Sequence, residues 1–456
     1  EGVRLPVPGG VPMKIGLEMH FQLPTRSKLF CSCPTASAEP NHNVCPVCLG
    51  YPGSRPSLNR KALEAGLSIA RFLDCAIEER VWFSRKTYFY PDLPKNFQIT
   101  QYESPLGTNG HFDLNGRRIG IWRVHLEEDP GRIKRVGRSG EEIAFVDYNR
   151  SGIPLVEIVT APDLTSPEEA RAFIDQLVIE LRSLCGLEAQ DEQTVRVDAN
   201  ISVGEERVEV KNVQGLRNLE KALRFEASRQ SKLLAAGKKV IRETRRFDEE
   251  RKVTSSAREK ETEEDYGYIG EPDLGEFRIG EMARNLDLKE TPLARARRLV
   301  SSFGIGEATA KQLVLTSPTL TDLFEELCRH VPPERAVSWT TGPISGNWTA
   351  LQEPEKWPLL LQIVKDDSDG RINDSEAKRR ILSLAGVQQE EVAEGGDDLA
   401  KLISDFVDAH PEVLADYRKN TKAANTVIGH VMKESKGRYS SKEVVEEVKK
   451  EMEKRV

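Results

Sequence analysis

A two-residue alternation of apolar and polar side chains in segment 15–23 constrains the fold of this chain more than any other feature. The apolar residues of the segment are Ile15, Leu17, Met19, Phe21 and Leu23, and the polar positions between them include Glu18, His20 and Gln22. This period is that of a β-strand with one buried face and one polar face. Segment 15–23 is therefore predicted to be a strand whose polar face includes Glu18 and His20.

Two further segments repeat this alternation. In segment 195–203 the polar positions include Arg196, Asp198 and Asn200, and in segment 119–127 Arg123, His125 and Glu127 share one side. A hairpin is expected where residues 204–206 form a turn into segment 208–211. Strands of this kind are typical of an antiparallel sheet with one buried and one polar face.

Helical patterns appear at 57–72, at 216–236, and after Ser166-Pro167-Glu168-Glu169, where a capping serine and a proline favour a helix start. From about residue 291 the chain reads as helices broken at glycine and proline. The expected class is α+β: a large, mostly antiparallel β-sheet cradle domain with helices, then a helical domain and a small all-α tail domain. The predicted boundaries are 1–290, 291–355 and 356–456.

Composition excludes several classes of protein. The 456 residues contain no run near the ~18 apolar residues that cross a bilayer, so we expect no membrane association. Lys and Arg total 66 against 73 for Asp and Glu, a net charge of −7. This acidity argues against nonspecific coating of nucleic acid but permits a local basic patch. The sequence lacks a P-loop motif, so any nucleotide site is of another type.

Four of the seven cysteines form two close pairs, Cys31-x-Cys33 and Cys45-x2-Cys48. Four thiolates at such spacings suit tetrahedral Zn²⁺ at ~2.3 Å per bond. Two disulfides or unligated thiols are the alternatives. A signal segment is not apparent, so we expect a reducing, cytoplasmic setting in which clustered cysteines favour metal. With all four ligands from the protein, the predicted zinc site is closed and structural.

Acidic residues gather on the polar positions of the predicted strands. Glu18 and His20 share one face, segment 125–129 reads His-Leu-Glu-Glu-Asp, and Glu157 follows later. Carboxylates with a histidine could hold Mg²⁺, which prefers oxygen ligands and binds nucleotide phosphates. A solvated sheet face is the alternative. Alternation places Glu127, not Glu128, beside His125 unless a bulge intervenes.

Two basic segments suggest contacts with phosphates. Residues 85–97 combine bases, aromatics and prolines, a composition that could meet a phosphate and a stacked base, although a packed structural loop is equally compatible. Between residues 417 and 438 six bases stand against one acid, Glu434, a local balance of +5. Nucleic-acid phosphates would favour such a patch, and a solvated helix face is the alternative.

Several motifs together resemble one family, the B subunits of the glutamyl/aspartyl-tRNA amidotransferases (the GatB/GatE family). The motifs occupy segments 15–23, 28–33, 88–95, 125–129, 146–155, 196–203, 209–212 and 271–274, and they span nearly the whole chain in order. The resemblance implies a subunit that uses ATP to phosphorylate the side-chain carboxylate of mischarged Glu-tRNA(Gln) or Asp-tRNA(Asn). Ammonia from a partner amidase A subunit then displaces the phosphate, and a small C subunit completes the heterotrimer.

The resemblance also implies roles for particular residues. The expected catalytic residues are His20, Lys86, Glu127 and Glu128. The expected magnesium ligands are Glu18, His20, Glu127, Glu128 and Glu157. The expected ATP contacts are Glu18, Tyr90, Lys95, Asp198, Asn200 and Lys211, with Asn212 beside them. The expected tRNA contacts are Arg418, Lys419, Lys422, Lys433, Lys436 and Arg438. The competing interpretations are a noncatalytic, zinc-stapled tRNA-binding scaffold and a ligase that needs no partner.

Overall fold

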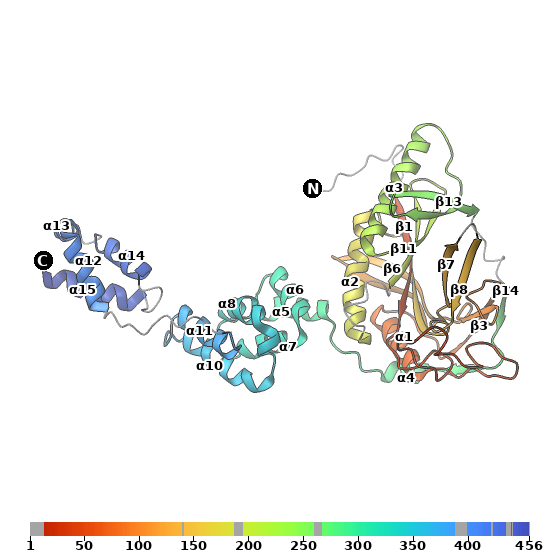
Figure 1. Cartoon of the computed structure of the whole chain (residues 1–456), viewed down its shortest axis with the longest axis horizontal. Helices are drawn as coiled ribbons and strands as arrows, with labels where there is room; N and C mark the ends of the chain where they lie inside the picture. The colour runs from red at the N-terminus through yellow and green to blue at the C-terminus, as the bar shows by residue number, and fades with distance from the viewer. Residues whose placement is uncertain are drawn as a thin grey trace. The chain divides into compact units, whose positions relative to one another are not determined.

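The computed structural model describes residues 13–138, 141–186, 195–259, 267–387, 399–420, 423–434, 439 and 441–455. The chain divides into two compact units, Glu1–Thr291 and Pro292–Val456 (Figure 1). The first contains a large β-sheet with helices, and the second is helical in the residues described. The predicted α+β class is therefore confirmed.

The first unit is built on an eight-stranded sheet in the order β13-β12-β11-β10-β1-β9-β6-β5. Its strands are β1 (Lys14–Gln22), β5 (Gly107–Leu114), β6 (Arg117–Glu128), β9 (Pro154–Thr160), β10 (Val195–Ser202), β11 (Val208–Gln214), β12 (Glu243–Asp248) and β13 (Val253–Glu259). All neighbours are antiparallel except β11 and β12, which are parallel. The predicted strand 15–23 lies near the centre of the sheet, between β9 and β10.

Three helices cover the apolar face of this sheet: α1 (Arg60–Phe72), α2 (Pro167–Cys185) and α3 (Leu216–Ala235). Figure 1 shows α2 and α3 together on one side of the sheet. The apolar positions of β1 are at most 1% exposed beneath them. The Ser166 hydroxyl accepts a hydrogen bond from Glu169 N and caps α2 as predicted. Helix α1 begins at Arg60, later than the predicted residue 57, because Asn59 caps it.

Smaller elements of the first unit lie outside the eight-stranded sheet. They are β2 (Arg80–Trp82), β3 (Ser84–Thr87), β4 (Phe97–Thr100), β7 (Arg132–Arg138), β8 (Glu141–Asp147), β14 (Gly267–Gly270), β15 (Glu276–Arg278) and α4 (Gly280–Asn285). Strands β14, β3 and β4 form one sheet, β15 pairs with β2, and β7 pairs with β8 as a hairpin. Within the predicted basic and aromatic segment 85–97, residues 85–87 belong to β3, residue 97 begins β4, and residues 88–96 connect the two strands.

In its described residues, the second unit has two separate cores of buried side chains. Residues between Ala296 and Ile381 form the first, and residues between Ile403 and Met452 form the second. The elements of the first core are α5 (Pro292–Phe303), α6 (Glu307–Thr316), α7 (Pro318–Leu327), α8 (Pro333–Trp339), η2 (Thr340–Ile344), η3 (Ser345–Asn347), α9 (Trp348–Leu351), η4 (Pro354–Lys356), α10 (Trp357–Ser368) and α11 (Asp374–Leu384). The predicted boundary between 355 and 356 falls inside this core, because α10 and α11 bury Leu360 and Ile381 in it.

The second core is formed by α12 (Leu399–Ala409), α13 (Pro411–Lys419), α14 (Ala424–Glu434) and α15 (Ser441–Arg455). Within the described residues this part of the chain is helical, as expected for the all-α tail. Across the residues that the structure describes, every helix is too short or too polar to span a bilayer.

Candidate active site and candidate metal centre

A compact group of two histidines and two glutamates lies on the polar face of the large sheet. Glu157 of β9 lies directly opposite His20 of β1 on one side and His125 of β6 on the other. Glu127 follows His125 by two residues and so shares its face. His20 Nε2 is 3.2 Å from Glu157 Oε2 and 3.4 Å from Glu127 Oε1, and His125 Nε2 is 3.3 Å from Glu157 Oε2. Three distant segments of the chain therefore converge on one buried polar group.

The histidines and glutamates of this group shift one another's pKa values toward the charged forms. Burial acts to lower the pKa of His20, but Glu157, Glu127 and Asp198 outweigh it and raise the pKa to about 9. The pKa of His125 is raised in the same way, mainly by Glu157 against the effect of burial. Burial acts to raise the pKa values of both glutamates, but the histidines hold the pKa of Glu127 low and that of Glu157 well below its ordinary value. The two histidines and the two carboxylates therefore stabilise one another's charged forms.

The same atoms fit a divalent cation. His20, Glu127 and Glu157 each offer one ligand atom, and these three atoms lie within 4.8 Å of one another. Carboxylate oxygens are preferred ligands of Mg²⁺, and imidazole nitrogen also suits Mn²⁺ and other transition metals. A cation bound here would take the place of the proton that His20 holds between the two carboxylates. The donor set therefore suits a hard divalent cation with open coordination positions.

Glu18 lies on the same face of β1, two residues before His20. Its carboxylate accepts a hydrogen bond of 3.0 Å from Asn200 Nδ2, and Glu18 pairs across the strands with Asp198. Lys211 Nζ is 3.9 Å from Asp198 Oδ2 and 3.6 Å from Glu209 Oε1. The structure therefore gathers the predicted residues Glu18, Asp198, Asn200 and Lys211 beside the His20 group, with Glu18 outside the set of three ligand atoms. The Asn212 side chain lies outside the described part of the chain.

Glu128 points to the opposite face from Glu127. Lys95 Nζ donates to both Glu128 carboxylate oxygens at 2.6 Å, and Ile99 N donates to Oε2 at 3.0 Å. Both partners of this ion pair are buried, with side chains at most 8% exposed. The predicted ATP contact Lys95 and the predicted metal ligand Glu128 are thus bound to each other, and Glu128 is separate from the His20 group.

Lys86 lies on β3, and Tyr90 lies on the segment that joins β3 to β4. Lys86 Nζ lies 5.9 Å from the centre of the Tyr88 ring, and the Tyr90 side chain is 48% exposed. The Tyr148 hydroxyl donates to Pro91 O at 2.8 Å. The loop is therefore fixed at Pro91 while Tyr90 remains accessible to a ligand.

Three residues of the site, His125, Asp129 and Arg196, belong to the predicted strands or the acidic segment but were given no individual role. Arg196 Nη2 donates to Asp129 Oδ1 at 2.7 Å, and the Asp129 side chain is fully buried. Arg196 lies directly opposite His20 on β10. The alternation that runs from His125 through Glu127 to Asp129 is the signal that could have found two of them, whereas Arg196 required the pairing of β1 with β10.

The four cysteines of the predicted zinc site converge in the loop that follows β1. The sulfur atoms of Cys31, Cys33, Cys45 and Cys48 lie within 4.8 Å of one another, and those of Cys45 and Cys48 are 3.9 Å apart. A tetrahedral ion with bonds of ~2.3 Å has ligand-to-ligand distances of about 3.8 Å. All seven cysteines lie in the described residues and are free thiols. The donor set and its spacing therefore fit a closed tetrahedral site.

Charge around this cluster favours a thiolate. A hydrogen bond from Cys31 lowers the pKa of Cys48 to about 5, although burial acts to raise it. The Cys45 amide and the charge of Lys28 also lower the pKa of Cys48. The same hydrogen bond raises the pKa of Cys31. Lys28 is completely buried, and its ammonium lies 3.7 Å from Cys48 Sγ while donating to the Asn43 and Tyr148 carbonyls. A buried lysine at this position offsets part of the negative charge of a thiolate cluster.

The basic tail is described only in part. Lys433 lies on α14 and is exposed. Arg418 and Lys419 belong to α13, with side chains outside the described part of the chain. Lys422, Lys436 and Arg438 also lie outside the described residues. The placement of this predicted tRNA-binding group thus remains a prediction for all but Lys433.

Comparison with known proteins gives two family matches. The family described as the GatB/GatE catalytic domain matches residues 13–284, and the family described as the GatB domain matches residues 322–452. The chain is 41% identical over 451 residues to the B subunit of the aspartyl/glutamyl-tRNA(Asn/Gln) amidotransferase of Methanospirillum hungatei, covering 93% of this chain and 95% of that protein. It is 39% identical to the protein of the same name from Methanocaldococcus jannaschii, covering 97% and 98%, and 40% identical to that of Moorella thermoacetica, covering 93% and 96%.

Proposed function

The chain belongs to the GatB/GatE family, and from that premise we propose that it is the tRNA-dependent B subunit of an aspartyl/glutamyl-tRNA amidotransferase. Its substrates are Glu-tRNA(Gln), Asp-tRNA(Asn) or both, together with ATP. In the first step a side-chain carboxylate oxygen attacks the γ-phosphorus of ATP, and ADP leaves. In the second step ammonia attacks the acyl carbon, a proton is lost, and phosphate leaves as the amide forms.

One observation carries this proposal: the convergence of His20, Glu127 and Glu157 on the polar face of the sheet. These three residues would hold Mg²⁺, which when bound would neutralise charge on the phosphates of ATP. A carboxylate is a poor electrophile, and converting its oxygen into a phosphate leaving group is what makes attack by ammonia feasible. A site that gathers phosphates beside a carboxylate substrate serves that purpose.

Other residues of the polar face have supporting roles in this proposal. His125 holds Glu157 in place through the 3.3 Å contact. Lys86 on β3, Tyr90 on the segment between β3 and β4, and Lys211 on β11 are suited to contact the phosphates. Lys95 and Glu128 act on the site through their buried ion pair, which fixes the end of this segment against β6.

The cysteine cluster would hold a structural Zn²⁺. Its four sulfur ligands fill a tetrahedral shell, so the ion would serve to fold the loop between β1 and α1. Ammonia would come from a partner amidase A subunit, a small C subunit would complete the complex, and the basic tail after residue 417 would contact the tRNA backbone.

A reconstituted assay tests the proposal. Purified chain is supplied with ammonium, ATP, Mg²⁺ and mischarged tRNA, and ATP turnover and amide formation are followed together. Turnover that depends on the mischarged tRNA is the expected result. Glu127→Gln and His20→Ala should lower it about a thousandfold or more and leave tRNA binding near normal, whereas Glu276→Gln, at an exposed site on β15, should leave it unchanged.

The noncatalytic scaffold gives the opposite result in the same assay. It predicts tRNA binding that is indifferent to ATP and Mg²⁺, and full complex activity in the Glu127→Gln variant. Amide formation from glutamine by the chain alone would instead support a ligase that needs no partner.

A further inference from the structure

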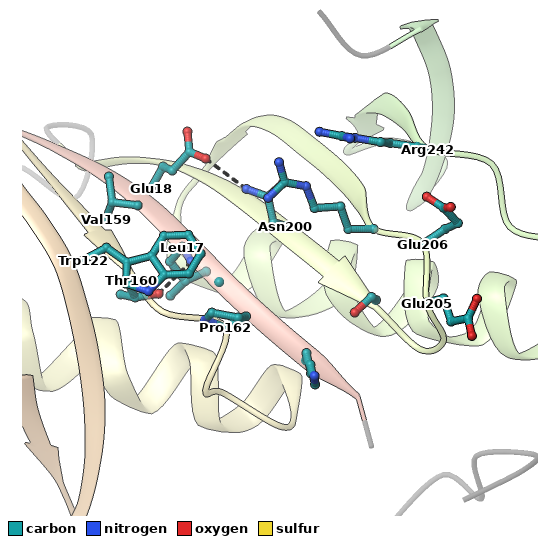
Figure 2. Close-up of a pocket in the computed structure, with 14 residues that line it drawn as sticks. Leu17, Glu18, Trp122, Val159, Thr160, Pro162, Asn200, Glu205, Glu206 and Arg242 are labelled. Atoms are coloured by element: carbon teal, nitrogen blue, oxygen red, sulfur yellow. Dashed lines mark hydrogen bonds between the residues drawn. The ribbon is translucent and has the colours of Figure 1, made fainter. Parts of the chain in front are cut away.

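The polar face of the large sheet has two different ends along β1. At the end where β1 begins, Glu18 and Asn200 line a cavity of about 350 Å³ (Figure 2). Trp122, at a bulge in the pairing of β6 with β9, lines the same cavity. At the other end, β1 leads into the loop of residues 31–50, which carries the four cysteines and is called the cysteine loop below. The cysteine loop therefore lies at the end of the polar face away from the cavity.

Asn41 joins the cysteine loop to the end of β8. Its side-chain amide donates to Val146 O at 3.0 Å and accepts from Tyr148 N at 2.7 Å, so it pairs with this backbone as a neighbouring strand does. The Asn41 backbone N donates to Asp147 Oδ1 at 3.0 Å. Its φ of 60° is one that asparagine adopts more readily than most residues. One exposed side chain thus holds three consecutive residues at the end of β8.

Asn149 adds contacts in the opposite direction. Its side chain accepts from Asn43 N at 2.8 Å and donates to Glu39 O at 2.6 Å. Lys28 Nζ joins the same two segments on their buried side, because it donates to both Asn43 O and Tyr148 O. The cysteine loop and residues 146–149 are therefore one hydrogen-bonded unit.

Tyr148 connects this unit to segment 88–96, which joins β3 to β4. Its hydroxyl donates to Pro91 O at 2.8 Å, directly after Tyr90 in the chain. Gly131 packs tightly beside it, because Gly131 N donates to Asp92 O at 2.8 Å and an added Cβ would lie 3.0 Å from the Tyr148 ring. The backbone that follows Tyr90 is therefore held in place from the cysteine loop.

The cysteine loop also contacts the far end of segment 88–96. Gly50 packs against Lys95 so closely that an added Cβ would lie 3.3 Å from Lys95 Cα and nearer still to its side chain. A Cβ at Gly152 would lie 3.8 Å from both Cys48 Cβ and Glu128 Oε1. Side chains at these two glycines would thus separate the cysteine cluster from the buried Lys95–Glu128 ion pair.

These contacts give two residues a role beyond folding. Resting on the proposed function, we propose that Asn41 and Tyr148 are positioning residues, which hold Tyr90 and the rest of segment 88–96 against the polar face from the cysteine loop. Both act through this segment rather than on the reacting atoms. A displacement of about 1 Å in a group that orients a substrate can lower a rate about a hundredfold, so the position of Tyr90 matters even though Asn41 lies outside the site.

Hydrogen exchange of the purified full-length chain tests the coupling. The amides of Leu93 and Asn96 are hydrogen-bonded within segment 88–96 and report its order. Asn41→Gly should speed their exchange about tenfold, and Tyr148→Phe about threefold to tenfold. Both variants should keep the zinc content of the wild type, because neither residue is a candidate ligand.

Asn115→Gly is the matched control. Asn115 is also exposed and has a φ of 49°, close to the 60° of Asn41. Glycine adopts this conformation readily at either position, so the two substitutions differ in the hydrogen bonds that they remove. Asn115→Gly should leave exchange in segment 88–96 and activity as in the wild type.

Kinetics in the reconstituted assay separate positioning from loss of stability. Asn41→Gly and Tyr148→Phe should raise the KM for ATP about tenfold, because Tyr90 is suited to contact the phosphates. The KM for mischarged tRNA should stay within about twofold of the wild type. Partial unfolding would instead lower kcat and leave the KM for ATP unchanged, because only the folded fraction turns over.

The outcomes distinguish this inference from the proposed function. Wild-type exchange of segment 88–96 in both variants would overturn the inference, and so would faster exchange with an unchanged KM for ATP. In either case, wild-type ATP turnover that depends on mischarged tRNA would leave the proposed function standing. A wild-type chain without such turnover contradicts the proposed function and the positioning role with it.

Discussion

Arg196 and Asp129 join strands that are separated by two others in the sheet. Arg196 Nη2 on β10 donates to Asp129 Oδ1, just past the end of β6, at 2.7 Å, and β1 and β9 lie between these strands. Gln22 at the end of β1 donates to the other Asp129 oxygen at 2.6 Å. This buried carboxylate therefore holds one end of the polar face together, next to the His20 group.

Arg196→Met should destabilise the first unit. The substitution removes one cation from a buried carboxylate but leaves Gln22 and Arg150 near it, so we expect a loss of about 1–3 kcal/mol. Denaturant unfolding of the full chain would measure it. Arg118→Met is a suitable control, because Arg118 is exposed and its ion pair with Asp113 is long, at 3.9 Å. Equal losses of stability in the two variants would contradict the assigned role of Arg196.

Glu127→Gln and Glu128→Gln should have contrasting effects, because the neighbouring side chains point to opposite faces. Glu127→Gln should lower Mg²⁺ or Mn²⁺ affinity about tenfold or more with little change in stability. Glu128→Gln should leave metal affinity unchanged and lower the free energy of unfolding by about 2–3 kcal/mol, because it leaves Lys95 buried without a charged partner. Metal titration and unfolding of both variants would measure this contrast, and a reversed pattern would show that the site is assigned to the wrong residue.

Removal of zinc should unfold the loop that follows β1. Elemental analysis should find about one Zn²⁺ per chain, and Cys48→Ser should lose it and lower the thermal midpoint, since metal binding and folding of such loops are coupled. Cys328→Ser, in the second unit, should retain the metal. A chelated chain with an unchanged thermal midpoint would argue against the structural zinc.

Lys28→Met tests the buried cation beneath the same cluster. Methionine keeps the aliphatic packing but removes the ammonium that lies 3.7 Å from Cys48 Sγ. Zinc affinity should fall about tenfold or more, measured by competition with a chromogenic chelator. Unchanged affinity would mean that the Asn43 and Tyr148 carbonyl contacts, rather than the charge, explain the position of this lysine.

Low pH should lower the stability of the second unit by protonating Glu325, which is paired with Arg298 and Arg295. Burial acts to raise its pKa, but hydrogen bonds from Arg298 and Arg295 outweigh this and lower the pKa below 4.5. Because the folded-state pKa is lowered, the stabilisation is complete above 4.5 and is lost as the pH falls through the folded-state value. Glu325→Gln should therefore cost about 1 kcal/mol at neutral pH, and this difference should disappear in strong acid. Unfolding of both proteins across the acid range would measure it, and a pH-independent difference would contradict the ionic origin.

Local patterns predicted the strands of the sheet and the faces of their residues. The period of segment 15–23 placed His20 and Met19 on opposite faces, and the same rule separated Glu127 from Glu128. The capping residues Ser166 and Pro167 located the start of α2. These features follow from neighbours in sequence, which is why they could be read directly.

Long-range pairing could not be predicted in the same way. The contact of Arg196 with Asp129 requires the strand order, and the position of Trp122 requires a bulge that changes the register between β6 and β9. The expected boundary after residue 355 lies within the range of the first helical core, where α10 buries Leu360 among side chains of the preceding helices. In each case the deciding partner is remote in the sequence.

The alternation within β1 has a consequence for mutational tolerance. One face of this strand contributes Glu18 to the polar network and His20 to the candidate metal group, while its other face fills the core. Deleting a single residue from β1 would exchange the two faces beyond the deletion, burying a charged imidazole and exposing methionine. Selection should therefore act on the length of this strand as strictly as on its chemistry.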